Sequence, residues 1–278
     1  MIILFYVLII LILKKYNNNE YFNNSNNSNN SNNSLCLLYA YYEKNDLYRN
    51  NFIYFLENGI LQEVDYYIII NGECTIDIPK LPNIKVYYRE NIGYDFGAYS
   101  YFINNRLKRE YQYYFFMNTS VTGPYLKYNN IPWYIPFLQL FKNNVAVVGT
   151  SINIFKKDGL STIYGKKNVY SHVQSMFFCI NNQYLNYLKN INFFDEDAIN
   201  NMKNIMDVIT HKEIGLSQNA INNGWNINCI LDKYRDLDYI NLDQNINTTS
   251  RSGDPYYDNA YFGSSIDKYD VIFYKNNR

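Results

Sequence analysis

The first half of the chain after residue 34 alternates short apolar runs with segments whose apolar residues recur at helical spacing. Leu35–Tyr42 is hydrophobic throughout, which is typical of a strand buried on both faces. Phe52, Phe55 and Leu56 share one helical face, and Gly59 is a suitable terminating residue. The predicted order is strand 35–42, helix 46–58, strand 65–70, strand 84–88, helix 97–107 and strand 113–117. Helices between buried strands predict an α/β fold with a mainly parallel sheet and flanking helices.

The second half is less regular. Four large apolar residues share one face of a predicted helix over 132–141, and an amphipathic helix with acids in its first turn is predicted over 195–210. The other predicted elements are strand 145–149, strand 172–180, helix 182–189, helix 213–222, strand 225–231 and strand 269–274. Neither an internal repeat nor a second linker interrupts this region, so residues 35–278 are predicted to form one domain.

Residues 1–16 are predicted to be an uncleaved N-terminal membrane anchor. Met1–Leu13 is almost wholly apolar, and Lys14-Lys15 follow it. The run is shorter than the roughly 20 apolar residues of a full span, and it lacks the basic start and small-residue cleavage site of a signal peptide. The alternative is a hydrophobic tail, or a wrongly assigned start, with no targeting role. The two lysines favour a cytosolic domain, but the orientation in the membrane stays open.

Residues 17–34 are predicted to be a disordered, low-complexity linker. Four copies of Asn-Asn-Ser fill positions 23–34, and none of them offers an apolar side chain for burial. Each copy is also an N-glycosylation acceptor by pattern. Low complexity alone produces that pattern, so a glycoprotein is expected only if the segment is lumenal.

Charge and cysteine content exclude some classes of protein. The chain has 25 basic and 25 acidic residues, so its formal net charge is zero. Nucleic-acid binding without sequence preference needs an excess of positive charge, so this class of protein is not expected. Its four cysteines are widely spaced and lie in or beside apolar runs, which favours buried free thiols over two disulfides. With only two histidines and no closely spaced cysteines, a zinc site is not expected.

Polar residues follow the predicted strands at the points where they end. Tyr41 closes the first strand, Asn71-Gly72 the second and Asn118-Thr119-Ser120 the fourth, while Asn91, Gly93 and Asp95 form a turn before a helix. The carboxyl ends of parallel strands meet at one edge of a sheet, where nucleotides bind in open α/β folds. Glycines allow close backbone approach, and the helix N-terminus favours an anionic group. Taken alone, the Asn-Gly-Asp turn is equally well explained as a turn and helix cap without a ligand.

These motifs resemble the rhamnan synthesis protein F group, rhamnosyltransferase-like proteins with a GT-A fold. The segment 91–98 fits the pattern N-x-G-x-D-x-G-A, and 116–120 followed by Gly123-Pro124 fits the L-N-D-S and Gly-Pro signature of that group. Further matches follow in order at 41–44, 71–74, 171–175, 213–217, 260–263 and 271–275. The resemblance implies a GT-A-like (Rossmann-like) sheet, a nucleotide-sugar donor, and a glycan or glycoconjugate hydroxyl as acceptor.

The donor site implied by the resemblance departs from the GT-A pattern in one respect. The implied donor-binding residues are Tyr41, Asn71, Gly72, Asn91, Gly93, Asp95, Asn118 and Ser120. Most GT-A enzymes carry D-x-D at the fourth strand end, whose carboxylates hold Mg²⁺ or Mn²⁺ against the donor diphosphate. Here Thr119 takes the place of the expected aspartate. Asp95 is the candidate metal ligand, with a ribose contact or a helix cap as the alternatives.

The candidate catalytic residues lie in the second half of the chain. Glu213 is the candidate general base, because a single carboxylate in reach of the acceptor hydroxyl suffices for that role. His172 and Gln174 are candidates to face the acceptor or donor sugar, and Asp254 belongs to a loop, 251–263, expected to close over the nucleotide. The structural alternatives are a first-turn charge for Glu213 and a hydrogen-bonding core residue for His172.

The sequence therefore predicts a membrane-anchored glycosyltransferase that acts by direct displacement with inversion, because no dedicated nucleophile is evident. Two alternatives stay open. One is a degenerate relative that binds a nucleotide-sugar or glycan without turnover, which the missing metal carboxylates favour. The other is a membrane-tethered structural or interaction protein that keeps only the fold.

Overall fold

A computed structural model describes residues 33–127, 131–156, 159–202 and 204–275. The predicted anchor and nearly all of the predicted linker lie outside the described residues. Of the helices in the described part of the chain, none is both long and apolar enough to cross a membrane.

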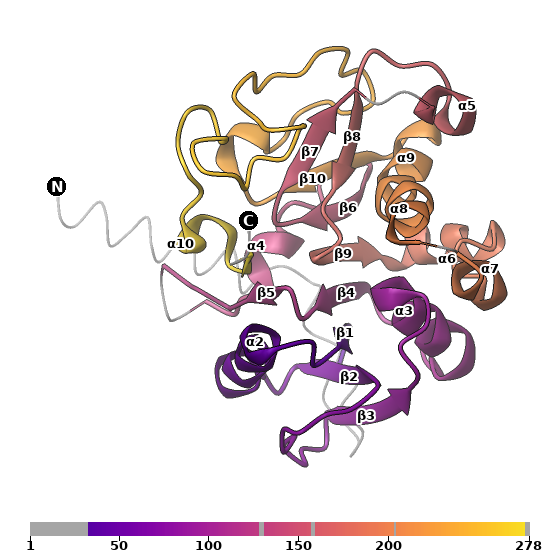
Figure 1. Ribbon diagram of the computed structural model, residues 1–278, viewed down its shortest axis with the longest axis vertical. Coiled ribbons are helices and arrows are strands. Elements are labelled where there is room, and N and C mark those ends of the chain that lie inside the picture. Colours follow the sequence, from indigo (N-terminus) through magenta and orange to yellow (C-terminus); the bar gives the residue numbers. More distant parts are fainter. Residues whose placement is uncertain (1–32, 128–130, 157–158, 203, 276–278) are drawn as a thin grey trace, which may run out of the picture. The chain divides into compact units, whose positions relative to one another are not determined.

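A seven-stranded sheet forms the centre of the structure, with the order β10-β6-β9-β4-β1-β2-β3 (Figure 1). Its strands are β1 (Leu35–Tyr41), β2 (Val64–Asn71), β3 (Ile84–Arg89), β4 (Tyr113–Asn118), β6 (Val145–Gly149), β9 (Phe177–Asn181) and β10 (Asn226–Cys229). β9 runs antiparallel to both of its neighbours, and the other pairs are parallel. The predicted α/β class with a mainly parallel sheet is confirmed, and it fits a GT-A-like fold.

Helices cover both faces of the sheet. α2 (Asp46–Asn58) packs on one face and α3 (Tyr94–Asn105), α6 (Asn182–Asn190) and α9 (Gly215–Asn222) on the other (Figure 1). The shorter helices are α4 (Ile135–Leu138), α5 (Leu160–Tyr164), α7 (Glu196–Asn200), α8 (Ile205–Val208), α10 (Lys268–Val271), the π-helical segment Ile209–Ile214 and the 3₁₀ turn Asp232–Tyr234. Two small sheets pair β7 (Ile152–Phe155) with β8 (Tyr170–Val173), and β5 (Val121–Thr122) with β11 (Tyr274–Lys275).

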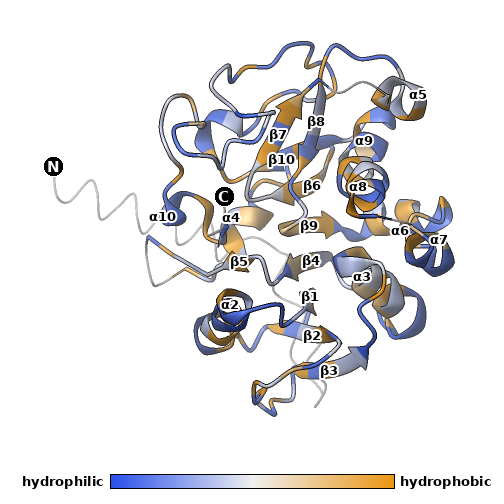
Figure 2. Cartoon of the chain, viewed as in Figure 1, coloured by the Kyte–Doolittle hydropathy of each residue, from blue (hydrophilic) through white to orange (hydrophobic). Residues whose placement is uncertain are grey.

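The core lies between the sheet and its helices, where the strands are hydrophobic in Figure 2. Every residue of β1 is buried, because this strand is covered on both faces. Tyr39 packs against Phe52 of α2 with ring centroids 4.9 Å apart, while Phe116 of β4 stacks on Phe178 of β9 at 4.5 Å. Cys36, Cys179 and Cys229 are buried free thiols, as predicted, and the free thiol of Cys74 is half-buried.

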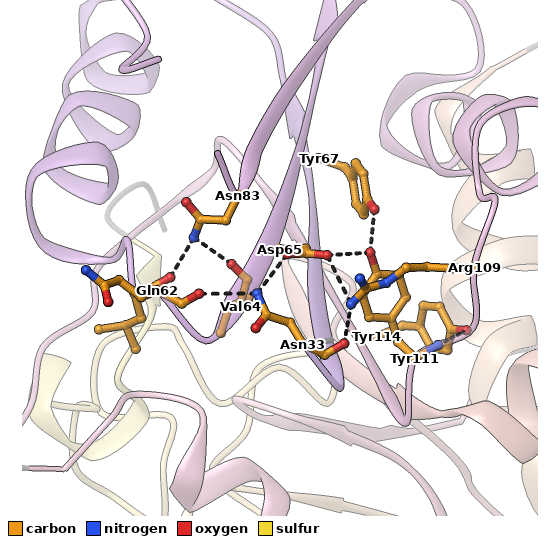
Figure 3. A network of polar contacts seen from close by, with 10 residues as sticks. Asn33, Gln62, Val64, Asp65, Tyr67, Asn83, Arg109, Tyr111 and Tyr114 are labelled. Atoms are coloured by element: carbon orange, nitrogen blue, oxygen red, sulfur yellow. Dashed lines mark hydrogen bonds and ion pairs between the residues drawn. The ribbon is translucent and has the colours of Figure 1, made fainter. Parts of the chain in front are cut away.

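A network of polar side chains lies at the amino-terminal end of the parallel strands (Figure 3). Asp65 of β2 accepts hydrogen bonds from Asn33 Nδ2 at 2.8 Å and from the Tyr111 hydroxyl at 2.7 Å, and it pairs with Arg109 at 3.2 Å. The Tyr67 and Tyr111 hydroxyls share a further hydrogen bond. The network ties the start of β1, through Asn33, to β2 and to the segment before β4.

Several predicted elements are wrong in extent. The helix predicted over 195–210 is broken into α7 and α8, because Asn204 caps a new helix by accepting from the Asp207 amide at 3.1 Å. The strand predicted over 172–180 is two strands separated at 174–176. Only Ile135–Leu138 of the helix predicted over 132–141 is α-helical. The strand predicted over 269–274 is instead α10 followed by the two-residue β11.

Candidate functional site

A cavity of about 590 Å³ lies at the carboxyl ends of β1, β2 and β4. Its lining comes from four parts of the fold. They are the strand ends with the start of α2 (Ala40, Tyr42, Lys44, Tyr48, Asn71, Asn118, Thr119, Ser120), the turn into α3 (Asn91, Tyr94, Asp95, Phe96), the β8–β9 break (Gln174, Ser175, Met176), and the α8 region with β11 (Ile205, Val208, Ile209, Glu213, Lys275). This volume is in the range of small-molecule sites.

The turn into α3 is fixed by glycines and by Arg89. Gly93 has a left-handed backbone with φ 72°, and a Cβ on Gly97 would lie 2.1 Å from the Ile92 carbonyl oxygen. Both positions therefore require glycine. The Arg89 guanidinium donates to Asn71 Oδ1 at 2.8 Å and to the Ile92 carbonyl at 2.9 Å. Arg89 thus joins the end of β2 to the turn.

Asp95 and Asn118 form one side of the cavity. Asn118 Nδ2 donates to Asp95 Oδ2 at 2.8 Å, and the Phe96 amide donates to Asp95 Oδ1 at 3.0 Å. Asn118 Oδ1 accepts from the Ser120 amide at 3.0 Å and from the Ser120 hydroxyl at 2.6 Å, which fixes the orientation of its amide. Burial and, to a smaller extent, the charge of Glu213 raise the pKa of Asp95 to about 6, although the hydrogen bond from Asn118 lowers it.

Glu213 lines the same cavity. His172 Nε2 lies 3.0 Å from Glu213 Oε1, and the Ser175 hydroxyl donates to Oε2 at 2.6 Å. Burial opposes ionisation, but these hydrogen bonds and the charge of Lys275 outweigh it, so the pKa of Glu213 lies below its ordinary value. An ionised carboxylate only accepts hydrogen bonds, so Nε2 carries the proton. His172 Nδ1 is buried and has no hydrogen-bond partner among the described residues.

Glu213 does not open a helix, contrary to the structural reading of the sequence. It lies in the π-helical segment between α8 and α9, inside one continuous helical run. The Tyr164 hydroxyl donates to the Thr210 carbonyl at 2.8 Å, and the buried Lys212 ammonium donates to the Phe193 carbonyl. The Tyr164 hydroxyl thus competes for a carbonyl of the helix, which favours a local break in the α-helical ladder, and π turns are frequent at functional sites.

The structure brings most of the predicted site residues together. Those that line the cavity are Asn71, Asn91, Asp95, Asn118, Ser120, Gln174 and Glu213. His172 does not line it but hydrogen-bonds to Glu213. Gly72 and Gly93 shape the adjoining turns without lining the cavity. Tyr41 is buried and donates its hydroxyl to Glu43 at 2.8 Å.

Asp254 does not line the cavity. It is buried beneath its own loop, where its Oδ1 accepts from the Tyr256 amide at 3.0 Å and its backbone bridges to Arg251. Gly253 of the same loop packs against the backbone of Ile154 in β7. No residue of the loop 251–263 lines the cavity, and at Gly253 the loop packs on β7.

Sequence reasoning did not single out Ser175, Lys44 or Lys275 as site residues. All three lie in segments that match the family, 41–44, 171–175 and 271–275, but no role followed from the match. Lys44 lies three residues after the end of β1, so its place in the chain was a usable signal. Lys275 reaches the cavity through the pairing of β11 with β5, in which it lies opposite Val121. No local pattern signals that pairing.

The side chains at the end of β4 do not fit the expected Mg²⁺ or Mn²⁺. Among the described residues, no cluster of three or more His, Cys, Asp or Glu side chains is arranged to hold a metal ion. At the strand end Asn118 directs an N–H donor toward Asp95, and Thr119 is buried. The hydroxyl of Ser120 is donated to Asn118. These groups do not form the pair of carboxylates with which GT-A enzymes hold the cation.

The fold and the cavity define an α/β protein with a candidate ligand site at the carboxyl edge of a mainly parallel sheet. A family model described as rhamnan synthesis protein F matches residues 80–251, which is more than half of the chain. The chain therefore belongs to the rhamnan synthesis protein F family, and the resemblance found in its sequence motifs is confirmed. The comparison with curated protein sequences gave no match.

Remote likenesses to solved structures accompany the family match. One is a glycosyltransferase involved in glycosylation of the major capsid of PBCV-1 (11% identity, TM-score 0.34, 63% of this chain and 74% of that one). Another is the galactosyltransferase LgtC in complex with donor and acceptor sugar analogues (9%, 0.33, 53% and 58%). A third is the mannosyltransferase PcManGT from Pyrobaculum calidifontis in complex with GDP-Man and Mn²⁺ (7%, 0.37, 66% and 53%). The chain thus spans about half to three quarters of these proteins, and none of them assigns a ligand to it.

Proposed function

We propose that the protein transfers a sugar from a nucleotide-sugar donor to a hydroxyl of a glycan or glycoconjugate. The observation that carries this proposal is one cavity, at the carboxyl edge of the sheet, lined by both Asp95–Asn118 and Glu213. Family membership supports sugar transfer as the chemistry. The cavity edge is where α/β folds bind nucleotides.

Glu213 is proposed to act as the general base. Its lowered pKa keeps it ionised at neutral pH, and it already accepts two hydrogen bonds from protein donors. The acceptor hydroxyl oxygen would bond to the anomeric carbon while the bond from that carbon to the donor diphosphate breaks. The electron pair leaves with the diphosphate, and the hydroxyl proton passes to Glu213. A single displacement of this kind inverts the anomeric centre.

A second candidate function is binding of a nucleotide-sugar or glycan without turnover. It is favoured by the strand end, where Asn118, Thr119 and Ser120 replace the acidic metal-binding pattern. Where the bound ligand is a nucleotide-sugar, the two candidates are separated by turnover and not by binding.

Membrane attachment through residues 1–16 is a further part of the proposal. It is supported by the apolar sequence of Met1–Leu13 alone. Expression of the full-length chain followed by carbonate extraction of membranes tests it. Retention in the membrane pellet is the expected result, and release by carbonate would contradict an anchor.

The test of function uses the purified full-length chain and a panel of nucleotide-sugars. Thermal unfolding is measured with each donor, with and without Mn²⁺, because preferential binding to the folded state raises the unfolding temperature. Donor hydrolysis and transfer to glycan acceptors are then measured for the stabilising donors. Stabilisation with turnover supports the enzyme, and stabilisation without turnover supports the binding protein. If no nucleotide-sugar stabilises or binds at millimolar concentration, the enzyme and the nucleotide-sugar-binding protein are both wrong.

A further inference from the structure

A donor diphosphate would enter a cavity that already holds two carboxylates. Asp95 and Glu213 both line it, and they are close enough for the charge of Glu213 to raise the pKa of Asp95. The diphosphate is anionic, and it gains charge as it leaves the sugar. Preorganised positive charge at this point is therefore required both for binding and for stabilising the transition state.

The strand end does not supply that charge in the GT-A manner. Asn118 Oδ1 is occupied by two donors from Ser120, and Asn118 Nδ2 is directed at Asp95. Thr119 is buried, and its hydroxyl is directed toward the Tyr42 carbonyl at 3.4 Å. A cation placed here would meet an N–H donor where a carboxylate is needed.

Among the described residues that line the cavity, the cationic side chains are Lys44 and Lys275. Lys275 is half-buried and is placed by β11, whose partner strand β5 begins directly after Ser120. The approach to β11 is anchored in the core, where Phe273 stacks on Phe177 with ring centroids 4.0 Å apart. The Tyr125 amide also donates to the Ile272 carbonyl at 2.7 Å. The ammonium is thus carried to the site by a well-packed segment.

Lys44 stands at the end of β1 on the exposed rim of the cavity. The neighbouring acid, Glu43, does not line the cavity. Glu43 accepts from the Tyr41 hydroxyl at 2.8 Å, from the Thr75 amide at 2.8 Å and from the Thr75 hydroxyl at 2.6 Å. Lys44 itself lines the cavity. The segment after β1 therefore presents the ammonium of Lys44 to a ligand, and the carboxylate of Glu43 is bound by Tyr41 and Thr75.

We propose that Lys275, assisted by Lys44, binds the diphosphate of the donor in place of a divalent cation. This inference rests on the proposed function, since it concerns the same ligand in the same cavity. The influence of Lys275 on Glu213 is consistent with it, because the positive charge lowers the pKa of that carboxylate. Binding of the diphosphate by Lys275 and Lys44 would place the leaving group in the same cavity as the proposed general base.

The experiment is isothermal titration calorimetry of the full-length protein with UDP, GDP and dTDP and with the matching nucleosides, in EDTA and in Mn²⁺. The expected result is that one diphosphate binds in EDTA about tenfold or more tightly than its nucleoside. Lys275→Gln should weaken the diphosphate about tenfold or more and leave the nucleoside unchanged. Lys275→Arg should retain most of the affinity, and Lys44→Gln should have the smaller effect because that side chain is exposed.

Lys142→Gln is the matched control. Lys142 is an exposed lysine, paired with Asp236 at 3.3 Å and absent from the cavity lining, so its loss should not change diphosphate affinity. Diphosphate binding that appears only with Mn²⁺ overturns the inference and leaves the proposed function standing. Unchanged diphosphate affinity in folded Lys275→Gln also overturns it. Absence of binding by any diphosphate, with or without Mn²⁺, overturns the inference and the proposed function together.

Discussion

Asp65 and Asp95 lie near opposite ends of the same sheet, and their surroundings differ. Asp65 is paired with the Arg109 guanidinium and accepts from Asn33 and Tyr111 (Figure 3). Asp95 accepts from an amide side chain and a backbone N–H, and its pKa is raised to about 6. The first carboxylate is matched with positive charge supplied by the fold. The second carboxylate, Asp95, borders a cavity and has no cationic partner from the fold among its cited hydrogen bonds. A ligand that brings positive charge or a hydrogen-bond donor would stabilise its ionised form.

The comparison separates a part of the molecule built for stability from a part built for binding. Both ends use the same strands, since β2 begins next to Asp65 and ends at Asn71 on the cavity. Unfavourable electrostatics tolerated at a cavity are a recognised mark of functional sites. Substitutions at the two ends should therefore fail in different ways.

The largest effect is expected from Glu213→Gln. The amide cannot take up the acceptor proton, so kcat for sugar transfer should fall by about 10²–10⁴-fold while the protein stays folded. Initial rates with the donor found by thermal shift, together with circular dichroism, measure both. Glu57→Gln, an exposed acid on α2, is the control and should retain activity. Full activity of Glu213→Gln would remove Glu213 from the mechanism.

Asp65→Asn should have the opposite effect to Glu213→Gln: the free energy of unfolding should fall, and the activity of the folded protein should be retained. The substitution leaves Arg109 without the carboxylate it pairs with at 3.2 Å, in a place where the aspartate side chain is 14% exposed. A loss of about 1–3 kcal/mol in the free energy of unfolding is expected. Urea unfolding measures it, with Lys142→Gln of an exposed ion pair as the control, expected to change stability by less than about 1 kcal/mol. An unchanged unfolding midpoint in Asp65→Asn would mean that the network does not stabilise the fold.

Asp95→Asn should change how stability depends on pH. Burial raises the folded-state pKa of Asp95 from its ordinary 3.8 to about 6, so the folded protein keeps a proton that the unfolded chain has released. Stability therefore falls as the pH rises through this window. Relative to the variant, the wild type should lose about 1–3 kcal/mol between about pH 4 and pH 7.

The lowered pKa of Glu213 acts in a different window. It stabilises the fold above the ordinary value of 4.5, and that contribution disappears as the pH falls below it. Urea titrations of the wild type and Asp95→Asn across pH 4–7 should therefore report Asp95. Parallel curves for the two proteins would show that Asp95 is not perturbed.

The smallest effect is expected from Ser175→Ala. Loss of the 2.6 Å hydrogen bond to Oε2 raises the pKa of Glu213, so the acid limb of the pH–rate profile should move to higher pH. At neutral pH the rate should fall by less than about tenfold. Ser217→Ala is the matched control, because Ser217 accepts from the Val173 amide and does not contact Glu213. A pH–rate profile that keeps its position would make Ser175 a purely structural residue.

The elements that could be predicted from sequence are those set by local patterns. Helix 46–58 is found with its predicted bounds, because Asn45 caps it and the apolar spacing of Phe52 and Phe55 is unbroken. Strand 145–149 is also found as predicted, since its uniformly apolar residues are buried. The cavity at the strand ends followed from the same patterns, because parallel strands place their ends together.

The misses come from long-range contacts. The run 172–180 looks like one strand, but the Asn118 amide donates to the Met176 carbonyl and the Gln174 amide to the Ser151 carbonyl. The chain therefore changes its pairing partner from β7 to β4 between Gln174 and Met176, and at this change the Ser175 hydroxyl donates to Glu213. Lys275 was missed for a related reason, because a two-residue strand paired with β5 leaves no periodicity in the sequence.

The π-helical segment makes the position of Glu213 tolerant of a change in chain length. A π turn holds more residues than an α turn, so it preserves the helices on both sides while absorbing extra chain. Removing one codon between Ile209 and Lys212 should restore α-helical winding and leave α8 and α9 in the same relative phase, so that Glu213, next to α9, keeps its direction. A deletion inside α9 itself would instead rotate the residues after it by about 100°.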